Sequence, residues 1–574
     1  MYIVRKSTTI LTLLLVCVAT AWGQASSVLA SGDWWRLAVQ GTGIYRLTVD
    51  DVPGLDGAEV SRIGLYGGSG EMLSLNNSQT PVDDLRPVAI EVHDADGDGR
   101  FGQGDWLLFF GEGTDVWSYV AGDRRWEMTR HSYATANHYY LTTTAAEPLR
   151  IAVAAAPVAD TVMGDYTAVA MVNRDQTNVY RTGQVWLGEK FTVSSATRNF
   201  TLSLPATASG ITLRYALASI SSATGTFNIS TTGFSRSNSI TTSGKYSTVL
   251  EAINARAQSL NFTIRYIPGE STAEGYLDFI EITGIVPLAL GSGQTLVRNN
   301  RHLGSTAAFR YSGGSGLRVW EVTKAGRERE MALADGQWVD YTTEARMYVA
   351  FDGSNYLAPA AVAKISNQDL HGAAAADLVV VCHPRFVSQA QRIALLHELL
   401  DGMETLVVTD QQVYNEFSGG KQDPMAMRSF LRHLRKSHPE RAPRYLLLFG
   451  KASYDPRNIL GNSVPTLVTY ETAFSFDDDG GSYSSDDMMG YLDDNESGGS
   501  AQSLDVSVGR LPAKDEAEAT HLVDKIEGYM MRRDLGEDAA RGSWRNFVAL
   551  LADDADPSRA GDPGFAHSSE VTAK

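Results

Sequence analysis

The sequence predicts a multidomain chain in which β-rich, sandwich-like N-terminal domains precede an α/β domain with a parallel sheet. Up to about residue 355, apolar residues alternate with period two between Gly- and Asp-rich turns, which is typical of half-buried strands. From Ala376 onward, continuous apolar strands alternate with amphipathic helices, which indicates a wound parallel sheet. The 574 residues leave room for about three to four domains of roughly 150 residues each.

Composition narrows the class of protein. Hydrophobic residues make up 43% of the chain and charged residues 20%, so packed cores are expected rather than disorder. The formal net charge of −18 argues against nucleic acid as a partner and suits cation binding. The two cysteines are Cys17 and Cys382, and Cys17 falls in the predicted leader, so the mature chain has no disulfide framework.

Residues 1–23 have the pattern of a secretory signal peptide. Arg5 and Lys6 precede the apolar run Ile10–Ala19, and Ala21 and Gly23 are small residues where a signal peptidase needs them. A soluble N-terminal helix is the alternative interpretation. No later stretch reaches about 18 uninterrupted apolar residues, so we expect an exported protein that is soluble or peripheral.

Three β-rich units are expected next, over residues 24–158, 159–290 and 291–375. The second is a Ser/Thr-rich sandwich, in which Phe200–Leu204 alternates apolar residues with a solvent-facing Thr and Ser. The third is a small connector domain that includes the strand Met347–Phe351. Strands of the first unit are predicted where apolar residues alternate: Trp35, Leu37 and Val39; Tyr45, Leu47 and Val49; Val88, Ile90 and Val92.

The α/β domain is expected over residues 376–574. Leu378–Val381 is a continuous apolar strand of the kind buried on both faces of a parallel sheet. Asp423 is a predicted N-cap with Pro424 at the first helical position. Further strands are Thr405–Thr409, Tyr445–Phe449, Asp505–Val508 and Phe547–Leu551. Helical spacing links Phe386, Ala390, Ile393, Ala394 and His397; Met427, Phe430, Leu431 and Leu434; and Ala519, Leu522, Val523, Ile526, Tyr529 and Met530.

The C-terminal residues suggest an incomplete domain. After the strand Phe547–Leu551, the segment His567–Lys574 begins a helix that stops after about two turns without a Gly, Pro or Asn to close it. We interpret the chain as truncated inside its last domain. A frayed natural terminus is the alternative.

A candidate calcium loop begins at Asp94. Three alternating Asp residues place carboxylates on one side of a tight turn, and Gly99 permits the bend. Asp occupies the twelfth position, where such loops usually have a bidentate Glu, so we expect an isolated structural Ca²⁺ site. An Asp/Gly-rich turn without an ion is the alternative. The predicted ligands are Asp94, Asp96, Asp98, the Arg100 carbonyl and Asp105.

Other candidate sites are weaker. Residues 477–496 carry a second acidic region, for which a solvated loop is favoured over calcium or a basic substrate. Cys382 and His383 are adjacent on a strand and therefore point to opposite faces, which argues against a nucleophile pair. His397 is expected to be a satisfied core residue. The sequence contains no Gly-x-Ser-x-Gly elbow, His-Glu-x-x-His motif or phosphate loop.

Several motifs, in their order, resemble the gingipain-type cysteine peptidases, family C25. Within that family the likeness is greatest to the sortases of the type IX secretion system, and it covers most of the mature chain. The motifs in the α/β domain are Val413–Pro424, Tyr445–Asp455, Ser485–Asp487 and Val508–Pro512. Those in the β-rich part are Gly43–Leu47, Asp96–Gly99, Gly104–Trp106 and Trp186–Glu189, followed by Phe191.

The resemblance implies a caspase-like α/β domain in an exported cysteine endopeptidase at the cell surface, associated with the outer membrane or extracellular. Such sortases remove C-terminal sorting signals from cargo and join the new end to an amine, as on lipopolysaccharide. Their implied partners are therefore cargo proteins, type IX secretion components and lipopolysaccharide. The catalytic His and Cys of the family follow further strands, so both are expected beyond Lys574, and no position here matches either.

Two departures from the family limit what it implies. Gly450-Lys451 stands where the family often has Gly-Asp, and no residue matches the acidic group of an arginine-specific pocket. One alternative function is a non-catalytic β-rich surface or binding protein with a degenerate peptidase-like domain. Another is a regulator, similar to a pro-domain, that occupies the cleft of a partner peptidase.

Overall fold

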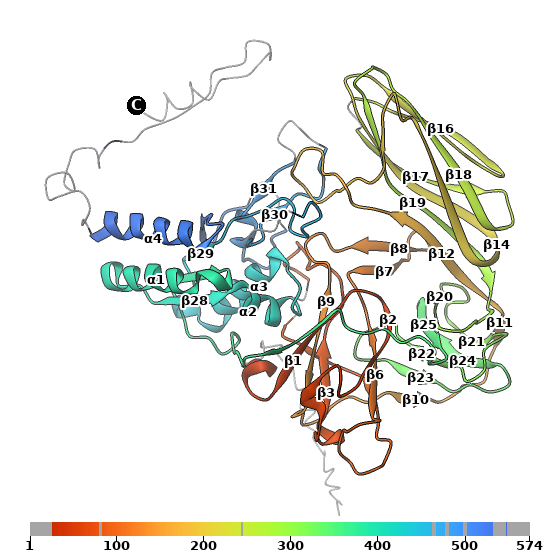
Figure 1. The fold of residues 1–574 in the computed structure, drawn as a ribbon, viewed down its shortest axis with the longest axis horizontal. Coiled ribbons are helices and arrows are strands. Elements are labelled where there is room, and N and C mark those ends of the chain that lie inside the picture. Colours follow the sequence, from red (N-terminus) through yellow and green to blue (C-terminus); the bar gives the residue numbers. More distant parts are fainter. Residues whose placement is uncertain are drawn as a thin grey trace, which may run out of the picture.

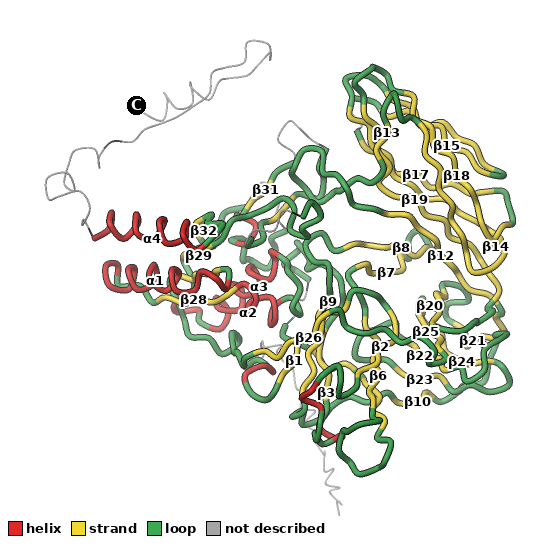
Figure 2. The backbone as a smooth tube through the Cα atoms, viewed as in Figure 1, coloured by secondary structure: helices red, strands yellow, loops and turns green. Residues whose placement is uncertain are grey.

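The computed structural model describes residues 26–79, 83–242, 245–461, 466–476, 482–497, 502–531 and Phe547. The predicted signal peptide, Asp477–Asp479, all of the predicted strand Phe547–Leu551 except Phe547, and the segment His567–Lys574 lie outside these residues. The described chain has far more residues in strands than in helices, and the longer helices gather at one end (Figure 2). This matches the predicted order of β-rich domains followed by an α/β domain.

Two small sheets enclose the first core. One has the order β26-β1-β9-β3-β4 and the other β2-β6-β5. Leu37, Val39 and Leu47 are fully buried between them, as the period-two alternation predicts. The strands are β1 (Trp34–Val39), β2 (Gly43–Leu47), β3 (Gly64–Gly67), β4 (Arg86–Val88), β5 (Ile90–His93), β6 (Trp106–Gly111), β9 (Asn137–Thr142) and β26 (Ala361–Ile365).

A 13-stranded sheet forms the largest part of the molecule (Figure 1). Its main path is β10-β23-β22-β25-β20-β12-β19-β14-β18-β15-β16, so strands from residues 159–290 and 291–375 share one sheet. Its strands are β10 (Ala152–Ala154), β12 (Asp165–Asn173), β13 (Lys190–Phe191), β14 (Thr197–Ile220), β15 (Gly225–Thr231), β16 (Phe234–Ile240), β17 (Tyr246–Ile253), β18 (Ala257–Ile267), β19 (Glu274–Pro287), β20 (Gln294–Asn299), β22 (Arg318–Glu321), β23 (Arg329–Met331) and β25 (Arg346–Phe351).

Strand β14 is 24 residues long and shows the predicted alternation. Phe200, Leu202 and Leu204 are buried, while Thr201 and Ser203 are exposed. The first part of β14 pairs with β18, and the second part pairs with β17 on one edge and β19 on the other. The register shifts between Ser203 and Ala208, around Pro205, which has no N–H to donate to the ladder.

Smaller elements complete the β-rich part. A three-stranded sheet has the order β11-β21-β24, and β7 and β8 form a separate hairpin. These strands are β7 (Asp115–Val120), β8 (Arg125–Arg130), β11 (Thr161–Met163), β21 (Ser305–Arg310) and β24 (Gln337–Thr342). Within the described residues, the short 3₁₀ helices are Val28–Ala30, Pro53–Leu55, Val60–Arg62, Pro384–Phe386, Pro439–Arg441 and Asp487–Met489.

The α/β domain has a four-stranded parallel sheet in the order β28-β27-β29-β32. Val379 and Val381 face the helices α2 and α3, whereas Leu378 and Val380 face α1 and α4. This alternation explains why β27 is buried at every position. The strands are β27 (Leu378–Cys382), β28 (Thr405–Thr409), β29 (Tyr445–Phe449) and β32 (Ser507–Leu511), with the hairpin β30 (Tyr470–Glu471) and β31 (Ser484–Ser485). The helices are α1 (Val387–Asp401), α2 (Asp410–Phe417), α3 (Pro424–Ser437) and α4 (Glu516–Met531).

The N-terminus of α3 joins the α/β domain to the first β domain. Asp423 caps the helix as predicted, accepting a hydrogen bond from the Met425 N–H at 2.8 Å. Its second oxygen accepts from the Leu73 N–H at 2.9 Å. The buried Lys421 donates to the Ser69 carbonyl at 2.7 Å. The loop that precedes α3 is therefore part of a packed interface between the two domains.

Candidate functional site

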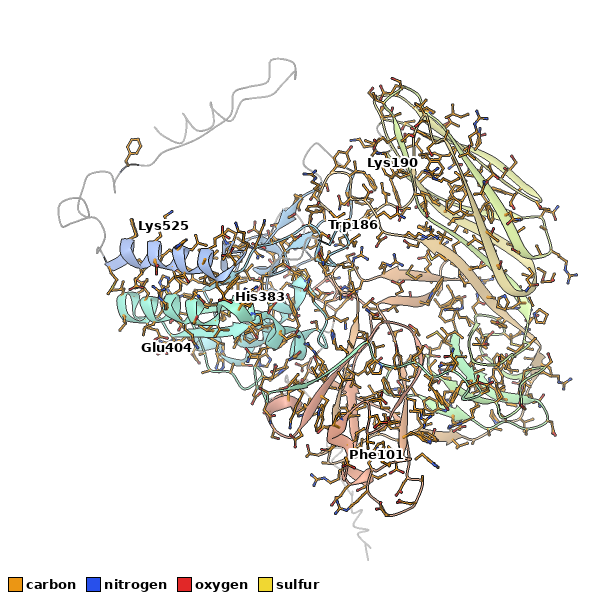
Figure 3. All side chains as sticks on the ribbon, in the orientation of Figure 1. Phe101, Trp186, Lys190, His383, Glu404 and Lys525 are labelled. Atoms are coloured by element: carbon orange, nitrogen blue, oxygen red, sulfur yellow. The ribbon has the colours of Figure 1, made fainter. Side chains whose placement is uncertain are left out.

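The carboxyl ends of the four parallel strands meet at one edge of the sheet, where wound sheets build their sites. Cys382 ends β27 and His383 follows it, Asp410 follows β28, and Gly450 and Lys451 follow β29. Figure 3 shows His383 within the α/β domain. The Gly450 N–H donates to the Leu511 carbonyl at 2.9 Å, so the loops after β29 and β32 are tied together.

Cys382 is a core residue in this structure. Its side chain is fully buried, and burial, together with the Asp410 carboxylate, raises the pKa of the thiol to about 12. His383 caps a 3₁₀ helix, with Nδ1 accepting from the Arg385 N–H at 3.2 Å. Burial and the Arg385 charge lower the pKa of His383. Neither side chain is arranged as half of a thiolate–imidazole pair, in agreement with the sequence prediction.

Asp410 is the buried carboxylate of this edge. Burial raises its pKa to about 7, although the Gln411 N–H donates to it at 2.7 Å and opposes the shift. The carboxyl group therefore titrates near neutral pH, which a general acid or base requires. The Asp410 carboxylate also raises the pKa of the buried Cys382 thiol.

An ion pair that the sequence did not predict organises the loops of this edge. Arg510 on β32 binds both oxygens of Asp486, each at 2.7 Å. The same guanidinium donates to the carbonyls of Gly450 and Leu467, at 2.8 and 3.0 Å, and of Val468 at 3.1 Å. Both residues lie in motifs that carry the family resemblance, but 24 residues separate them, so no local spacing links them.

In the described part of the second acidic region, exposed carboxylates pair with cations of α3, and Asp493, Glu496 and Asp505 each place one oxygen within 4.8 Å of the others. Asp494 pairs with Arg432 at 2.6 Å and with Lys436 at 2.9 Å. Asp493 pairs with Arg435 at 2.9 Å. The side chains of Asp494 and Asp493 remain 71% and 54% exposed, as expected of a solvated loop, and α3 presents a row of cations to them. Asp477–Asp479 lie outside the described residues.

The imidazole of His397 has a partner, as expected, but it is not a core residue. Its side chain is 27% exposed, and Nδ1 lies 2.6 Å from Asp401 Oδ2, one turn further along α1. In the structure, residue 397 lies at the margin of the apolar face of α1. The carboxylate four residues later decides its environment instead.

The predicted calcium loop brings three of its carboxylates together. Asp94, Asp96 and Asp98 each place one oxygen within 4.8 Å of the others. Asp105 lies outside this group and braces the loop, accepting from the Ala95 N–H at 2.8 Å and the Gly102 N–H at 2.7 Å. The Arg100 side chain donates to the Gly57 carbonyl at 2.8 Å.

The loop backbone favours charged carboxylates. Gly97 and Gly99 have φ values of 73° and 79°, the left-handed region in which glycine is least strained. Their N–H groups both donate to Asp94 at 2.8 Å, and these bonds lower the pKa of its carboxyl group. A carboxylate that stays ionised, with lone pairs left over, suits a hard cation.

A second polar cluster, which the sequence analysis missed, lies between the first β domain and the α/β domain. His371 is fully buried between two carboxylates, with Nδ1 2.6 Å from Glu416 and Nε2 3.0 Å from Asp83. Burial opposes protonation, but the two carboxylates outweigh it and raise the pKa of His371 to about 9. His433 lies beside it, 4.7 Å between ring centroids. Four separate segments of the chain supply these residues, so no local sequence motif predicts the cluster.

The loop after β29 also contacts the second β domain. The rings of Trp186 and Tyr454 stack, 6.1 Å apart and 11° from parallel. Glu471 accepts from the Gly183 N–H at 2.8 Å. Figure 3 shows Trp186 between the α/β domain and the large sheet. The edge of the parallel sheet is therefore supported by the β-rich part of the chain.

Comparisons with known proteins agree with this architecture. No curated protein matches the chain. The crystal structure of dimeric latent PorU from Porphyromonas gingivalis is similar over 92% of this chain and 52% of that chain, with 24% identity and a TM-score of 0.78. The chain thus spans about half the length of that PorU chain.

Two carbohydrate-binding modules match far less of the fold. CBM36 in complex with calcium and xylotriose has 15% identity, covers 20% of this chain and 98% of its own, and has a TM-score of 0.15. TmCBM61 in complex with β-1,4-galactotriose has 15% identity, covers 21% of this chain and 88% of its own, and has a TM-score of 0.13. Such scores are too low to support an argument. Residues 371–573, in contrast, match the model of peptidase family C25, and the fold of the chain is similar to that of PorU.

Proposed function

We propose that this chain is part of an exported cysteine endopeptidase with transpeptidase activity, which removes C-terminal sorting signals from cargo of the type IX secretion system. The observation that carries the proposal is the PorU-like fold over 92% of the chain, combined with the C25 match at residues 371–573. The proposed location is the cell surface, at the outer membrane or outside it. Within the described residues, no helix has the length and apolar character to cross a membrane.

The proposed reaction is acyl transfer through a thioester. A cysteine thiolate attacks the scissile carbonyl, backbone N–H groups stabilise the oxyanion, and an imidazolium protonates the leaving amine. An acceptor amine, with lipopolysaccharide as the proposed carrier, then attacks the thioester and regenerates the thiolate. Water as acceptor gives hydrolysis instead. Type IX components at the outer membrane are the proposed partners that deliver cargo.

The proposal requires a nucleophile other than Cys382. Its thiol is fully buried and has its pKa raised to about 12. The part of the chain that the structure describes instead supplies a scaffold, in which the Arg510–Asp486 ion pair fixes the loops at the sheet edge.

The test uses the product from its native source. Its intact mass is measured, the gene is read past codon 574, and a cargo protein with its sorting signal is incubated with it and followed by mass spectrometry. Cleavage that survives Cys382→Ser but is abolished by a thiol alkylator supports the proposal. A product that ends at Lys574 and leaves cargo intact overturns it and favours the non-catalytic binding protein.

We also propose that Asp94, Asp96 and Asp98 bind a structural Ca²⁺, with the Arg100 carbonyl and Asp105 as further ligands. The clustered carboxylates and the lowered pKa of Asp94 support this. Calcium at a hundred times its dissociation constant would add about 2.7 kcal/mol to the free energy of unfolding. EDTA should therefore lower the melting temperature of the wild type and of the exposed control Asp56→Ala, but not that of Asp96→Ala. Equal melting with and without EDTA would contradict the site.

A further inference from the structure

Three potential metal ligands converge where the first β domain meets the α/β domain. Asp83 precedes β4, His371 precedes β27, and His433 lies on α3. Each offers one ligand atom, and these atoms lie within 4.8 Å of one another. The cluster lies outside the sheet edge and the Asp94 loop, and the proposed peptidase reaction does not use it.

The surroundings hold His371 in one orientation. Its ring stacks on Phe417, 4.6 Å between centroids and 9° from parallel. Its Nδ1 lies 2.6 Å from Glu416, which is fully buried on α2. Glu416 is itself fixed, because it accepts from the N–H groups of Leu370 at 2.9 Å and His371 at 3.1 Å. Because Nδ1 of His371 is hydrogen-bonded to the Glu416 carboxylate, its Nε2 points toward Asp83.

This carboxylate–histidine arrangement is the one that surrounds zinc ligands in proteins, where the second ring nitrogen binds the metal. The distance from His371 Nε2 to Asp83 Oδ1 is 3.0 Å. Two ligands about 2.0 Å from a tetrahedral zinc lie about 3.3 Å apart, so little movement is needed. His433 adds a second imidazole, and its Nε2 also lies 2.9 Å from the His371 carbonyl.

We propose that Asp83, His371 and His433 bind Zn²⁺, with Glu416 orienting His371 and a water in the fourth position. Two imidazoles and one carboxylate favour zinc over calcium, which prefers oxygen ligands alone. The metal takes the place of the proton that His371 Nε2 otherwise donates to Asp83. Because the ligands come from separate domains, the ion would fasten the loop before β4 to α3 and to the turn before β27.

The test is metal binding by the whole, metal-free chain, with excess Ca²⁺ present to occupy the Asp94 loop. We expect one Zn²⁺ per chain by mass spectrometry, and Co²⁺ should give the intense visible bands of a four-coordinate site. Asp83→Asn, at a side chain that is 37% exposed, and His433→Gln should each weaken Zn²⁺ binding by at least about tenfold. Circular dichroism checks that both variants fold.

The matched control is His438→Gln, at the end of the same helix, where the imidazole bonds only to the Ala373 carbonyl among the described contacts, at 2.9 Å. It should bind Zn²⁺ as the wild type does. Absence of stoichiometric Zn²⁺, or affinity unchanged in both ligand variants, would overturn the proposal. The cluster would then be an ion-pair contact between His371 and its two carboxylates.

Discussion

Burial sets the chemistry of individual side chains in this chain more than their sequence neighbours do. Cys382 and His383 are adjacent, but one is a neutral core thiol and the other caps a 3₁₀ helix. Arg510 and Asp486 are distant in sequence, yet they form a bidentate pair whose side chains are only 11% and 22% exposed. Substitutions at these positions should therefore follow burial and hydrogen bonding.

Cys382 should react slowly in the folded protein. Because its thiol is buried and its pKa is raised to about 12, iodoacetamide should modify the native mature chain at least about a hundredfold more slowly than the urea-unfolded chain. Rates of labelling at pH 8, followed by mass spectrometry, provide the measurement. Rapid stoichiometric labelling of the native chain would show that Cys382 is a reactive thiol.

Removing the Arg510 guanidinium should lower the free energy of unfolding substantially. Arg510→Met leaves Asp486 and three loop carbonyls without their donor, and losing one partner of a shielded pair typically costs about 3–5 kcal/mol. The control is Arg392→Met, whose side chain is 40% exposed beside Asp524, with an expected cost of at most about 1 kcal/mol. Urea titrations give both free energies of unfolding. Equal costs would refute the structural role of the pair.

At the scale of elements, patterns that depend on local geometry were predictable. The alternation in β14, the buried strand β27 and the cap at Asp423 follow from side-chain direction and helix-end chemistry. The partial exposure of His397 could not be predicted, because helical spacing does not show where the margin of a buried face lies. The cluster around His371 could not be predicted either, since its members come together only through tertiary packing.

Removing the cap of α3 should lower the free energy of unfolding more than removing an ordinary helix cap does. Asp423→Ala removes the acceptor of the Met425 N–H and leaves the Leu73 N–H of the other domain unpaired, with an expected cost of about 2–4 kcal/mol. Asp515→Ala removes only the bond from the Glu518 N–H at α4, with an expected cost of about 1 kcal/mol. Thermal and urea unfolding measure both. A similar cost for the two would mean that the Leu73 contact contributes nothing.

At the scale of the whole molecule, buried carboxyl groups make stability depend on pH. Burial raises the pKa of Asp278 to about 6 and of Glu281 to about 7, and that of Asp423 to about 6. These groups lie in two regions far apart in sequence. Each carboxyl group stays protonated and neutral up to a higher pH in the folded chain than in the unfolded chain, so together they favour the folded state in mild acid.

The sign follows from linkage. A carboxyl group whose pKa is raised by folding contributes stability that is present below its unfolded pKa and is lost as pH rises through the folded pKa. For Glu281 that window runs from 4.5 to about 7. The free energy of unfolding should therefore fall by about 1–3 kcal/mol for this group between pH 4.5 and 8, and Glu281→Gln should reduce the slope. Urea titrations across this range would contradict the argument if the two slopes matched.

Strand β14 has a consequence for how the molecule opens. One uninterrupted backbone supplies ladder partners to β18 at its start and to β17 and β19 at its end. Neither end of the large sheet can separate without releasing part of this shared strand. The amide protons on either side of the register shift at Pro205 should consequently exchange with solvent in the same opening event, so the large sheet behaves as one cooperative unit rather than as two hinged halves.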